Sequence, residues 1–411
     1  MSFDESLVKE ARSEALDLFE KRRLVARLRL TPTTPWWGGD YSVKTSQNVD
    51  EDEINGRLRW FLRTVYNRFC ARDLSDYSEA ERFVGSFLGS TGSASKYVFR
   101  ANTLGPGEGL LGQLRRLPRV RLTMRSRGNL GLSEEDLLPL NLRGLELSIY
   151  RTRADEDPKY DDLVVGGSLI TLAFLGVGRG ANRGFGRFTP SECPAAGSQF
   201  IRELCTYIRD SKVTESFRLY YDKFKEVTGC GSVNSWEKSA VPLAPLVDGK
   251  GPDVIRAIPN CTARDSYEAL RALQEAFLKA NLRWVMAGRG ARIPSAEVHS
   301  WLLGLPRQVK NTGYFLVGEE SEEAGRRQSM LVASPVRVNN GYRLYLLPFL
   351  SLKDHARIYN MLEHRGGSGE VTRVSDLIKD EEDLKNVISE IVDAVAKAAE
   401  RRCRAQHVTT R

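Results

Sequence analysis

The spacing of apolar side chains in the first half of the chain restricts its fold more than any other feature of the sequence. Residues 24–31, LVARLRLT, alternate between apolar and polar side chains, which predicts a half-buried strand. The loop PTTPWWGGD follows, and in residues 54–69 the apolar side chains lie along one helical stripe. This half of the chain is therefore expected to begin with a strand, a loop and an amphipathic helix.

The same reasoning extends the pattern to residue 190. Residues 119–127, RVRLTMRSR, alternate again, and residues 144–151 predict a further strand. Residues 164–176 are a short apolar segment that predicts a buried helix, and a short strand is expected at residues 185–189. The predicted order is strand, helix, strand, strand, helix, strand, which is the split βαβ or ferredoxin-like arrangement.

The rest of the chain predicts a second domain. A single core rarely grows beyond roughly 250–300 residues, so a chain of 411 residues is expected to form two. A helical period marks residues 198–227, 265–286 and 382–402, and residues 330–351 are two apolar strands joined at Asn339-Asn340-Gly341. We therefore expect an α+β fold with one domain at residues 1–190 and another at residues 191–411.

Arginine dominates the positive charge of the chain. The net charge is +8, and 45 of the 61 basic residues are arginine. A guanidinium group binds phosphate oxygens two at a time and stacks on bases, so an excess of arginine favours nucleic acid as a partner. A GC-rich genome also raises the arginine content, so the positions of the arginines must decide between these interpretations.

The densest combination of glycine and arginine is LGVGRGANRGFGRF, residues 175–188, which has five glycines, three arginines and no acidic residue. It lacks the GK[ST] ending of a P-loop, and it follows a predicted helix where a dinucleotide-binding loop would follow a strand. Its glycines let a backbone approach phosphate closely, and Arg179, Arg183 and Arg187 supply charge. Polyanion binding is the functional interpretation, and a tight surface turn with solvated arginines is the alternative.

The adjacent tryptophans Trp36 and Trp37 lie on a loop that ends in Gly38 and Gly39. Two neighbouring tryptophans do not easily point into one core, so at least one is expected to be exposed and able to stack on a base or a partner. A tryptophan pair wedged between two domains is the alternative.

The predicted helix at residues 54–69 has a basic face opposite its apolar stripe. Arg59 and Arg63 are four residues apart with Trp60 beside them, and Arg57 flanks the stripe. Proteins often hold single strands on such a surface, although a solvated helix face is the alternative. The basic face of residues 119–127 is a weaker candidate of the same kind, because the aromatic signature of an RNA-recognition motif is missing.

These segments together give the predicted RNA-binding residues. The full set is Trp36, Trp37, Gly38, Gly39, Arg57, Arg59, Trp60, Arg63, Gly176, Gly178, Arg179, Gly180, Arg183, Gly184, Gly186, Arg187, Arg326 and Arg327. The last two precede the first strand of the C-terminal hairpin.

The sequence offers little for catalysis. All four histidines lie in the C-terminal third and none has a patterned neighbourhood. The acidic run DEDE at residues 50–53 is typical of the N-cap and first turn of the following helix, which leaves Asp40 as a lone, weak candidate. We therefore expect no catalytic residue, no metal and no cofactor.

The cysteines and the hydropathy pattern indicate the compartment. The six cysteines lie far apart and form no CxxC pair, so they are expected to be reduced and structural. No run of 18 apolar residues occurs, and the first residues are charged throughout. These features predict a soluble cytoplasmic protein without a membrane partner.

Three of these motifs, in this order, resemble the RAMP superfamily of CRISPR systems. TPTTPWWGGD is similar to the family's Gly-Gly loop after its first strand, INGRLRWFLRTVYNRF to a helix that opens with Ile-x-Gly-x-Leu-Arg, and LGVGRGANRGFGRF to its glycine-rich loop. The blend of motifs, with Gly304-Leu305-Pro306 further on, is most similar to the double-domain head subunit of type III-B effector complexes. The paired tryptophans depart from the family, which more often has aliphatic residues there.

The resemblance implies two ferredoxin-like domains in tandem with additional helices. It also implies a noncatalytic subunit that caps a ribonucleoprotein near the 3′ end of the guide RNA, contacts guide or target single-stranded RNA, and docks on other RAMP subunits. A RAMP endoribonuclease that uses Asp40 or a C-terminal histidine is one alternative, and a subunit that touches only protein is another. The position of the glycine loop in the middle of the chain argues against the single-chain guide-processing nucleases, whose loop lies near the C-terminus.

Overall fold

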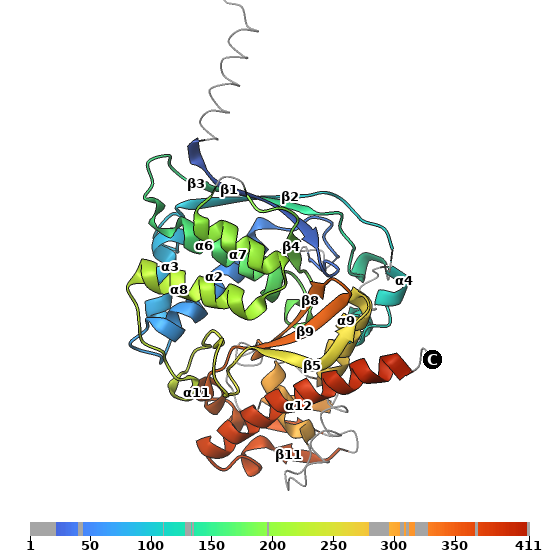
Figure 1. The fold of residues 1–411 in the computed structure, drawn as a ribbon. Helices are drawn as coiled ribbons and strands as arrows, with labels where there is room; N and C mark the ends of the chain where they lie inside the picture. The colour runs from blue at the N-terminus through green and yellow to red at the C-terminus, as the bar shows by residue number, and fades with distance from the viewer. Residues whose placement is uncertain are drawn as a thin grey trace, which may run out of the picture.

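The computed structural model describes residues 22–39, 44–109, 111–127, 133, 135–194, 197–278, 296–304, 308–309, 312–316, 328–365 and 369–408. Within these residues the chain is a mixed α+β structure with three antiparallel sheets (Figure 1). The first sheet lies at the top of Figure 1 with helices beneath it, and the second sheet lies between these helices and the C-terminal helix.

The first sheet has the strand order predicted for the N-terminal part of the chain. Its strands are β1 (Leu24–Pro32), β2 (Tyr97–Thr103), β3 (Leu145–Arg151) and β4 (Phe188–Pro190), in the order β2-β3-β1-β4. Helix α2 (Glu51–Phe69) lies between β1 and β2 in the chain, and α6 (Asp161–Ile170) lies between β3 and β4. Every pairing is antiparallel, which is the βαββαβ topology of the ferredoxin-like arrangement.

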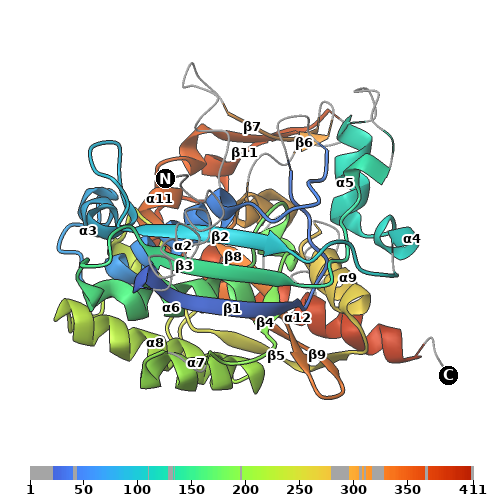
Figure 2. The same cartoon turned by 90° about the horizontal axis from the view of Figure 1, so that it is seen from above.

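The alternation in β1 explains which face of this sheet is buried. Leu28 and Leu30 are buried on the helix side, whereas Arg27 and Arg29 are exposed on the other side. Figure 2 looks down on this open face and shows β2, β3 and β1 side by side.

The second strand of the sheet is not the segment that the sequence indicated. Residues 119–127 were expected to be a strand, but they belong to helix α5 (Pro118–Arg127), and the strand is β2, which the sequence analysis missed. Leu117, Val120 and Met124 fall on one face at helical spacing and belong to one apolar cluster, whereas Leu122 is 41% exposed. Proline is favoured in the first turn of a helix, so Pro118 suits the observed start.

Helices extend the first apolar core beyond residue 190. Helices α3 (Ser78–Leu88), α7 (Gln199–Arg209) and α8 (Val213–Thr228) pack around α2 and α6. Buried side chains of α7 and α8, such as Leu204 and Tyr220, belong to the same cluster as Leu28 and Leu147 of the sheet. The proposed division of the chain at residue 190 stays a prediction, and these contacts join residues on both sides of it.

The second sheet repeats most of the topology of the first. Its strands β5 (Arg256–Ala263), β9 (Gly341–Pro348) and β8 (Leu331–Val338) pair in that order. Helix α9 (Ser266–Ala276) follows β5, and α12 (Glu381–Val408) packs on α9 and β5. The hairpin predicted at Asn339-Asn340-Gly341 is the turn between β8 and β9. The order is βαββα, and the described residues supply no fourth strand to this sheet.

Both faces of the second sheet are buried. Val332, Tyr345 and Leu347 belong to the apolar core of the first sheet. Leu331 and Leu346 belong to a second core with α9 and α12. The sheet therefore separates two cores and contributes side chains to each of them.

The remaining elements are short. A third sheet has the order β11-β10-β7-β6 and contains β6 (Gln308–Val309), β7 (Thr312–Leu316), β10 (Leu362–Arg365) and β11 (Val371–Arg373). Two short α-helices are α4 (Leu111–Leu114) and α11 (Leu352–Ala356), and a π-helical turn, Thr171–Leu175, continues α6. Single 3-10 turns or short 3-10 helices occur at Glu135–Leu137, Pro158–Tyr160, Ala181–Arg183, Trp236–Lys238, Ala296–Leu303, Tyr359–Met361 and Val374–Asp376. Among the described helices none is both long and apolar enough to cross a membrane.

Disulfide bonds join the six cysteines in three pairs. Cys70 at the end of α2 bonds to Cys230 after α8, and Cys261 of β5 bonds to Cys403 of α12. The third pair is Cys193–Cys205. The expectation of reduced cysteines is therefore wrong. Partners 160 and 142 positions apart cannot be recognised from sequence spacing.

Candidate nucleic-acid interface

The glycine-arginine loop, residues 175–188, folds directly onto the loop that carries the tryptophans. The Gly186 amide donates to the Pro35 carbonyl at 2.9 Å, and the Arg179 amide donates to the Trp37 carbonyl at 2.5 Å. Within the loop, the Val177 amide donates to the Gly186 carbonyl at 3.0 Å. Gly186 has a φ of +64°, and a Cβ there would lie 2.0 Å from the Val177 carbonyl oxygen, so only glycine fits. Two motifs that are about 140 residues apart in sequence thus form one structural unit.

Both tryptophans are fully buried, so the expectation that one of them is exposed is wrong. Trp36 packs against Phe188 and donates its indole N–H to the Ser46 carbonyl at 3.0 Å. Trp37 packs edge-on against Phe185 and donates its indole N–H to the Leu137 carbonyl at 3.0 Å. Because each ring is enclosed and its polar atom is satisfied, neither stacks on a base in this structure. A Cβ at Gly38 would lie 2.3 Å from the Trp36 ring, which explains the glycine there.

Arg187 is also fully buried, which conflicts with its predicted contact to RNA. Its side chain donates to four backbone carbonyls and one hydroxyl, at distances of 2.6 to 3.4 Å: those of Leu175, Ala181, Phe185, Ala333 and Ser334. Burial lowers the pKa of Arg187 far below its ordinary value, and the nearby charge of Arg57 lowers this pKa further. The guanidinium holds the loop in shape and ties it to β8, and phosphate cannot reach it.

Arg183 reaches from the same loop to the C-terminal half of the chain. Its guanidinium donates to the Leu303 carbonyl at 2.5 Å and to the Ser329 hydroxyl at 3.2 Å, and it lies 3.9 Å from the centre of the Phe277 ring. The adjacent Gly184 is packed so closely that a Cβ would lie 2.8 Å from Leu270. This part of the loop joins the two halves of the molecule.

Arg179 differs from the other two arginines of the loop because it lies beside the start of α2. Its guanidinium lies over the Trp37 ring, 5.9 Å from the ring centre, and against Gly39, where a Cβ would lie 2.2 Å from Nη2. Arg179 is half-buried. Its charge also acts on Glu53, in the first turn of α2.

The pKa of Glu53 is raised to about 7. Burial of the carboxyl is the largest cause, and the charge of Asp50 adds to it. The charge of Arg179 and a hydrogen bond from the Gly39 backbone lower the pKa and only partly offset this rise. Glu53 is therefore only partly ionised at neutral pH and neutralises only part of the charge of Arg179.

Arg57 connects α2 to the loop through neutral groups. Its guanidinium donates to the Asn182 side-chain oxygen at 2.6 Å and to the Leu175 carbonyl at 3.4 Å, and it lies 4.3 Å from the centre of the Trp60 ring. Burial lowers the pKa of Arg57 to about 9, so the group remains protonated at neutral pH. The structure thus brings Gly39, Arg57 and Arg179 together with the glycine loop.

Arg59 and Arg63 of α2 lie away from this cluster, whereas Trp60 lies under the Arg57 guanidinium at its edge. Arg59 donates to the carbonyls of Leu88 and Gly89 at the end of α3, at 2.8 and 2.6 Å. Arg63 pairs with Glu81 of α3 at 2.8 Å. Trp60 packs on Phe349, with 4.5 Å between ring centres. These side chains are used within the chain, and the predicted basic face is partly covered by α3.

Some candidates lie outside the described residues, namely Arg326, Arg327 and Asp40. Conversely, sequence reasoning missed Glu53 and Asn182 as members of the cluster. The sequence assigned Glu53 to the acidic first turn of a helix, and Glu53 does lie in the first turn of α2. Asn182 lies inside the glycine-arginine loop but was not named as a member of the site. No spacing rule would have paired Asn182 with Arg57, 125 residues away.

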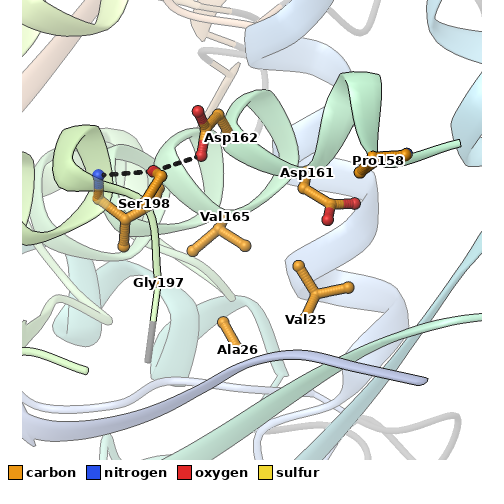
Figure 3. Close-up of a pocket in the computed structure, with 9 residues that line it drawn as sticks. Val25, Ala26, Pro158, Asp161, Asp162, Val165, Gly197 and Ser198 are labelled. Atoms are coloured by element: carbon orange, nitrogen blue, oxygen red, sulfur yellow. Dashed lines mark hydrogen bonds between the residues drawn. The ribbon is translucent and has the colours of Figure 1, made fainter. Parts of the chain in front are cut away.

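A cavity lies on another part of the molecule. It has a volume of about 300 Å³ and lies where β1, α6 and the start of α7 meet (Figure 3). Asp162 accepts a hydrogen bond from the Ser198 hydroxyl at 2.6 Å at its edge. Two aspartates line it, and no basic residue is among its lining residues, so it does not suit an anion.

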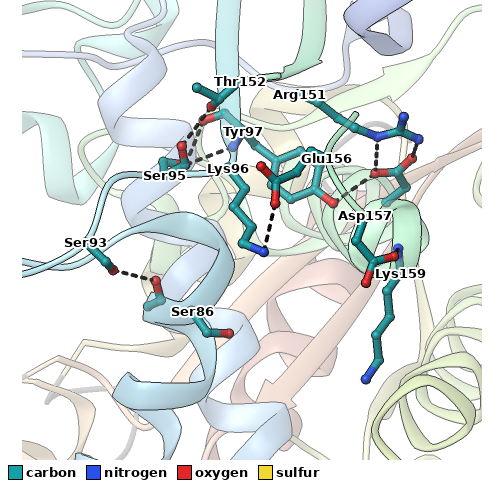
Figure 4. Close-up of polar contacts among 12 residues, drawn as sticks. Ser86, Ser93, Ser95, Lys96, Tyr97, Arg151, Thr152, Glu156, Asp157 and Lys159 are labelled. Atoms are coloured by element: carbon teal, nitrogen blue, oxygen red, sulfur yellow. Dashed lines mark hydrogen bonds and ion pairs between the residues drawn. The ribbon is translucent and has the colours of Figure 1, made fainter. Parts of the chain in front are cut away.

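A polar network beside this cavity is satisfied within the chain. Asp161 accepts from the Tyr97 hydroxyl at 2.9 Å and pairs with the Arg151 guanidinium. Figure 4 labels Tyr97 and Arg151, the two partners of this carboxylate. Lys96 pairs with Glu156 at 2.8 Å in the same view. These contacts fasten β2 and β3 to α6, and we assign them a structural role.

Comparisons with known proteins agree with this geometry. Residues 29–189 match the sequence model of the RAMP superfamily. In solved structures, Cmr1 from Pyrococcus furiosus in its apo form aligns with 79% of this chain and 87% of its own, with 14% identity and a TM-score of 0.51. Two further matches come from structures of the type III-B Cmr-β complex bound to cognate target RNA, and one of these structures also has AMPPnP and was obtained in the presence of ssDNA. Each match covers 91% of this chain and 100% of its own chain. Their identity is 13%, and their TM-scores are 0.50 and 0.54.

At this level of identity the structural likeness establishes the fold and no more, and no protein with a curated description matches the sequence. The matched segment contains the end of β1, the Gly-Gly loop, α2 and the glycine-arginine loop. Over residues 29–189 the chain is therefore similar to the RAMP superfamily.

Proposed function

We propose that this chain is a subunit of a type III-B CRISPR effector complex and binds the backbone of single-stranded RNA at Arg179. The observation that carries the proposal is the gathering of three arginines, Arg57, Arg179 and Arg187, where α2 meets the glycine-arginine loop. Arg57 is half-buried and Arg187 is fully buried, both on neutral oxygen atoms, and Glu53 beside Arg179 has its pKa raised to about 7. Guanidinium groups gathered at one place favour an anion such as a phosphate group.

The chemistry of the cluster fits a phosphate backbone better than a base. The loop exposes no aromatic face, since both tryptophans are buried, so base stacking is not provided there. Guanidinium and backbone N–H groups position a strand without reading its sequence. We therefore expect binding without strong sequence preference.

The second sheet supports a tandem arrangement. We infer that β5, α9, β8, β9 and α12 form a second ferredoxin-like domain that lacks its fourth strand. The basis for this inference is the shared order, βαββα in the second unit against βαββαβ in the first. In the proposed complex the chain caps the assembly near the 3′ end of the guide RNA and docks on other RAMP subunits without cleaving RNA.

Fluorescence anisotropy of labelled single-stranded RNA at several salt concentrations tests the binding site. The variant Arg179→Gln is expected to weaken binding and to make the salt slope shallower by about 0.7, the value for one lost phosphate contact on a single strand. Arg218→Gln is the matched control, because Arg218 is an exposed arginine on α8 that pairs with Asp248. An unchanged slope in Arg179→Gln would show that the loop is only a structural turn.

Two further assays test the finer parts of the proposal. Incubation of guide-like RNA with the protein, with and without divalent cations, is expected to leave the RNA intact. Specific cuts that disappear in Asp40→Ala would contradict the noncatalytic role. In the assembled complex, a photoreactive nucleotide is expected to crosslink to this chain from the 3′ end of the guide and not from its 5′ end.

A further inference from the structure

The insertion between β2 and β3 contains the most basic short segment of the chain. Residues 111–127 include six arginines and no acidic residue. They form α4 and α5, which lie at the side of the first sheet, next to α9 (Figure 2). The function proposed above does not use this segment.

The insertion is fixed firmly to the rest of the molecule. Leu114, Leu117 and Val120 are fully buried in a small apolar cluster whose other members include Trp37 and Phe185. The Arg119 amide also donates to the Gln274 side chain of α9 at 2.9 Å. The insertion therefore has a defined position relative to the glycine-arginine loop, because Phe185 belongs to that loop.

The outer surface of the insertion is exposed and positively charged. Arg115, Arg116, Arg119 and Arg121 are all exposed. The structure gives the Arg116 and Arg121 guanidinium groups no acidic partner among the residues that it describes. Two cations that stay hydrated and unpaired on a rigid support are suited to contact phosphates.

We propose that Arg116 and Arg121 form a second contact surface for the RNA backbone, in addition to the one at Arg179. Trp37 is the common neighbour of both places: the Arg179 guanidinium lies over its ring, and the apolar side of α4 and α5 packs against it. A strand bound at Arg179 that continues past Trp37 meets the basic insertion. The path along one strand rests on the proposed function, whereas the surface itself does not.

The observations favour RNA over an acidic protein as the occupant. Protein interfaces usually have an apolar centre. Among the described residues of α4 and α5, Leu122 is the one large apolar side chain that is strongly exposed, so this surface offers no such centre. The charge is carried by arginine alone, which binds phosphate in a bidentate manner.

The test compares RNA binding by the wild type and by the double variant Arg116→Gln/Arg121→Gln. Affinity is measured at several salt concentrations, which gives a salt slope, with one RNA of about six nucleotides and one of about thirty. With the long RNA the slope is expected to become shallower by about 1.4, two contacts at about 0.7 each. With the short RNA, which we expect to bind at Arg179, the salt slope of the double variant should equal that of the wild type. The control Arg27→Gln/Arg29→Gln removes the same charge from the open face of the first sheet, where both arginines pair with Glu146.

The outcomes separate this proposal from the proposed function. If the double variant leaves the slope with long RNA unchanged, the surface is not an RNA contact, and this holds even if the variant loses affinity for a partner subunit. A loss in the double variant together with no effect of Arg179→Gln would support the surface and reject the loop site. Circular dichroism is expected to show the wild-type fold, since both side chains are exposed.

Discussion

Replacement of Arg187 by methionine should separate the structural role of the glycine-arginine loop from its role in binding. Methionine keeps much of the length of the side chain but has no N–H groups. The carbonyls of Leu175, Ala181, Phe185 and Ala333 would therefore lose the donors that they have at 2.6 to 3.2 Å. Three of these contacts lie within the loop, and the contact to Ala333 joins the loop to β8.

The expected cost follows from the number of acceptors. A buried polar group left without its partner costs about 1–3 kcal/mol. The Leu175 carbonyl keeps the donor of Arg57 and the Ala181 carbonyl keeps the Gly184 amide, so we take the low end for each carbonyl, which gives about 4 kcal/mol for the four. Removal of a buried charge, whose pKa burial holds far below its ordinary value, returns part of this free energy. We expect Arg187→Met to lower the free energy of unfolding by about 3 kcal/mol, a large part of the usual total of about 5–15 kcal/mol.

Urea unfolding, followed by tryptophan fluorescence, measures this cost, since Trp36 and Trp37 pack against the loop. Arg179→Met is the matched control: the same exchange in the same loop should change stability by less than about 1 kcal/mol but reduce RNA binding. If Arg187→Met keeps the stability of the wild type and loses RNA affinity, the assignment of Arg187 as a buried structural residue is refuted.

Three further predictions concern the disulfides and the buried ionisable groups. Cys70→Ser/Cys230→Ser opens a loop of 160 residues and should lower the free energy of unfolding by up to about 5 kcal/mol in the chain-entropy treatment. In urea unfolding the wild type under reducing conditions should lose at least as much, because all three disulfides are then open. Because the pKa of Glu53 is raised from 4.5 to about 7, the folded state binds the proton of this carboxyl more tightly than the unfolded state does, and the stability that this proton contributes is lost as pH rises from 4.5 through 7. Glu53→Gln should flatten this part of the profile of stability against pH. The RNA affinity of the wild type should fall over the same pH range, because ionised Glu53 competes with RNA for Arg179. The pKa of the buried His299 is lowered to about 4, so stability should be lost as pH falls from 6.5 through 4, and His299→Phe should reduce that loss in urea unfolding at acidic pH.

Periodicity identified the N-terminal fold where one face of an element is buried. In β1 the exposed residues are arginines and the buried ones leucines, so alternation in the sequence is alternation in space. In α5 the same test failed, because Val120 and Met124 are compatible with both a strand and a helix, and only the exposure of Leu122 distinguishes the two. The disulfides were missed because the partners meet only after the chain has folded.

The candidate site was predicted at the level of segments and not of side chains. Sequence reasoning singled out the glycine-arginine loop and the start of α2, which the structure brings together through Arg57 and Asn182. It treated Arg179, Arg183 and Arg187 alike, but positive φ angles in the loop turn each arginine in a different direction. The tryptophans show the same limit, because a glycine-flanked loop looks exposed in sequence although Gly38 lets the Trp36 ring lie beneath it.

The burial of the second sheet on both faces has a consequence for cooperativity. Because Val332 and Leu347 complete the core of the first half while Leu331 and Leu346 complete that of the second, neither half has a full core of its own. Separation of the halves would expose apolar side chains on both, so they should melt in one transition and not as independent domains. Hinge motion between the halves is equally disfavoured, so the residues of the proposed RNA contacts should keep their relative positions when a strand binds.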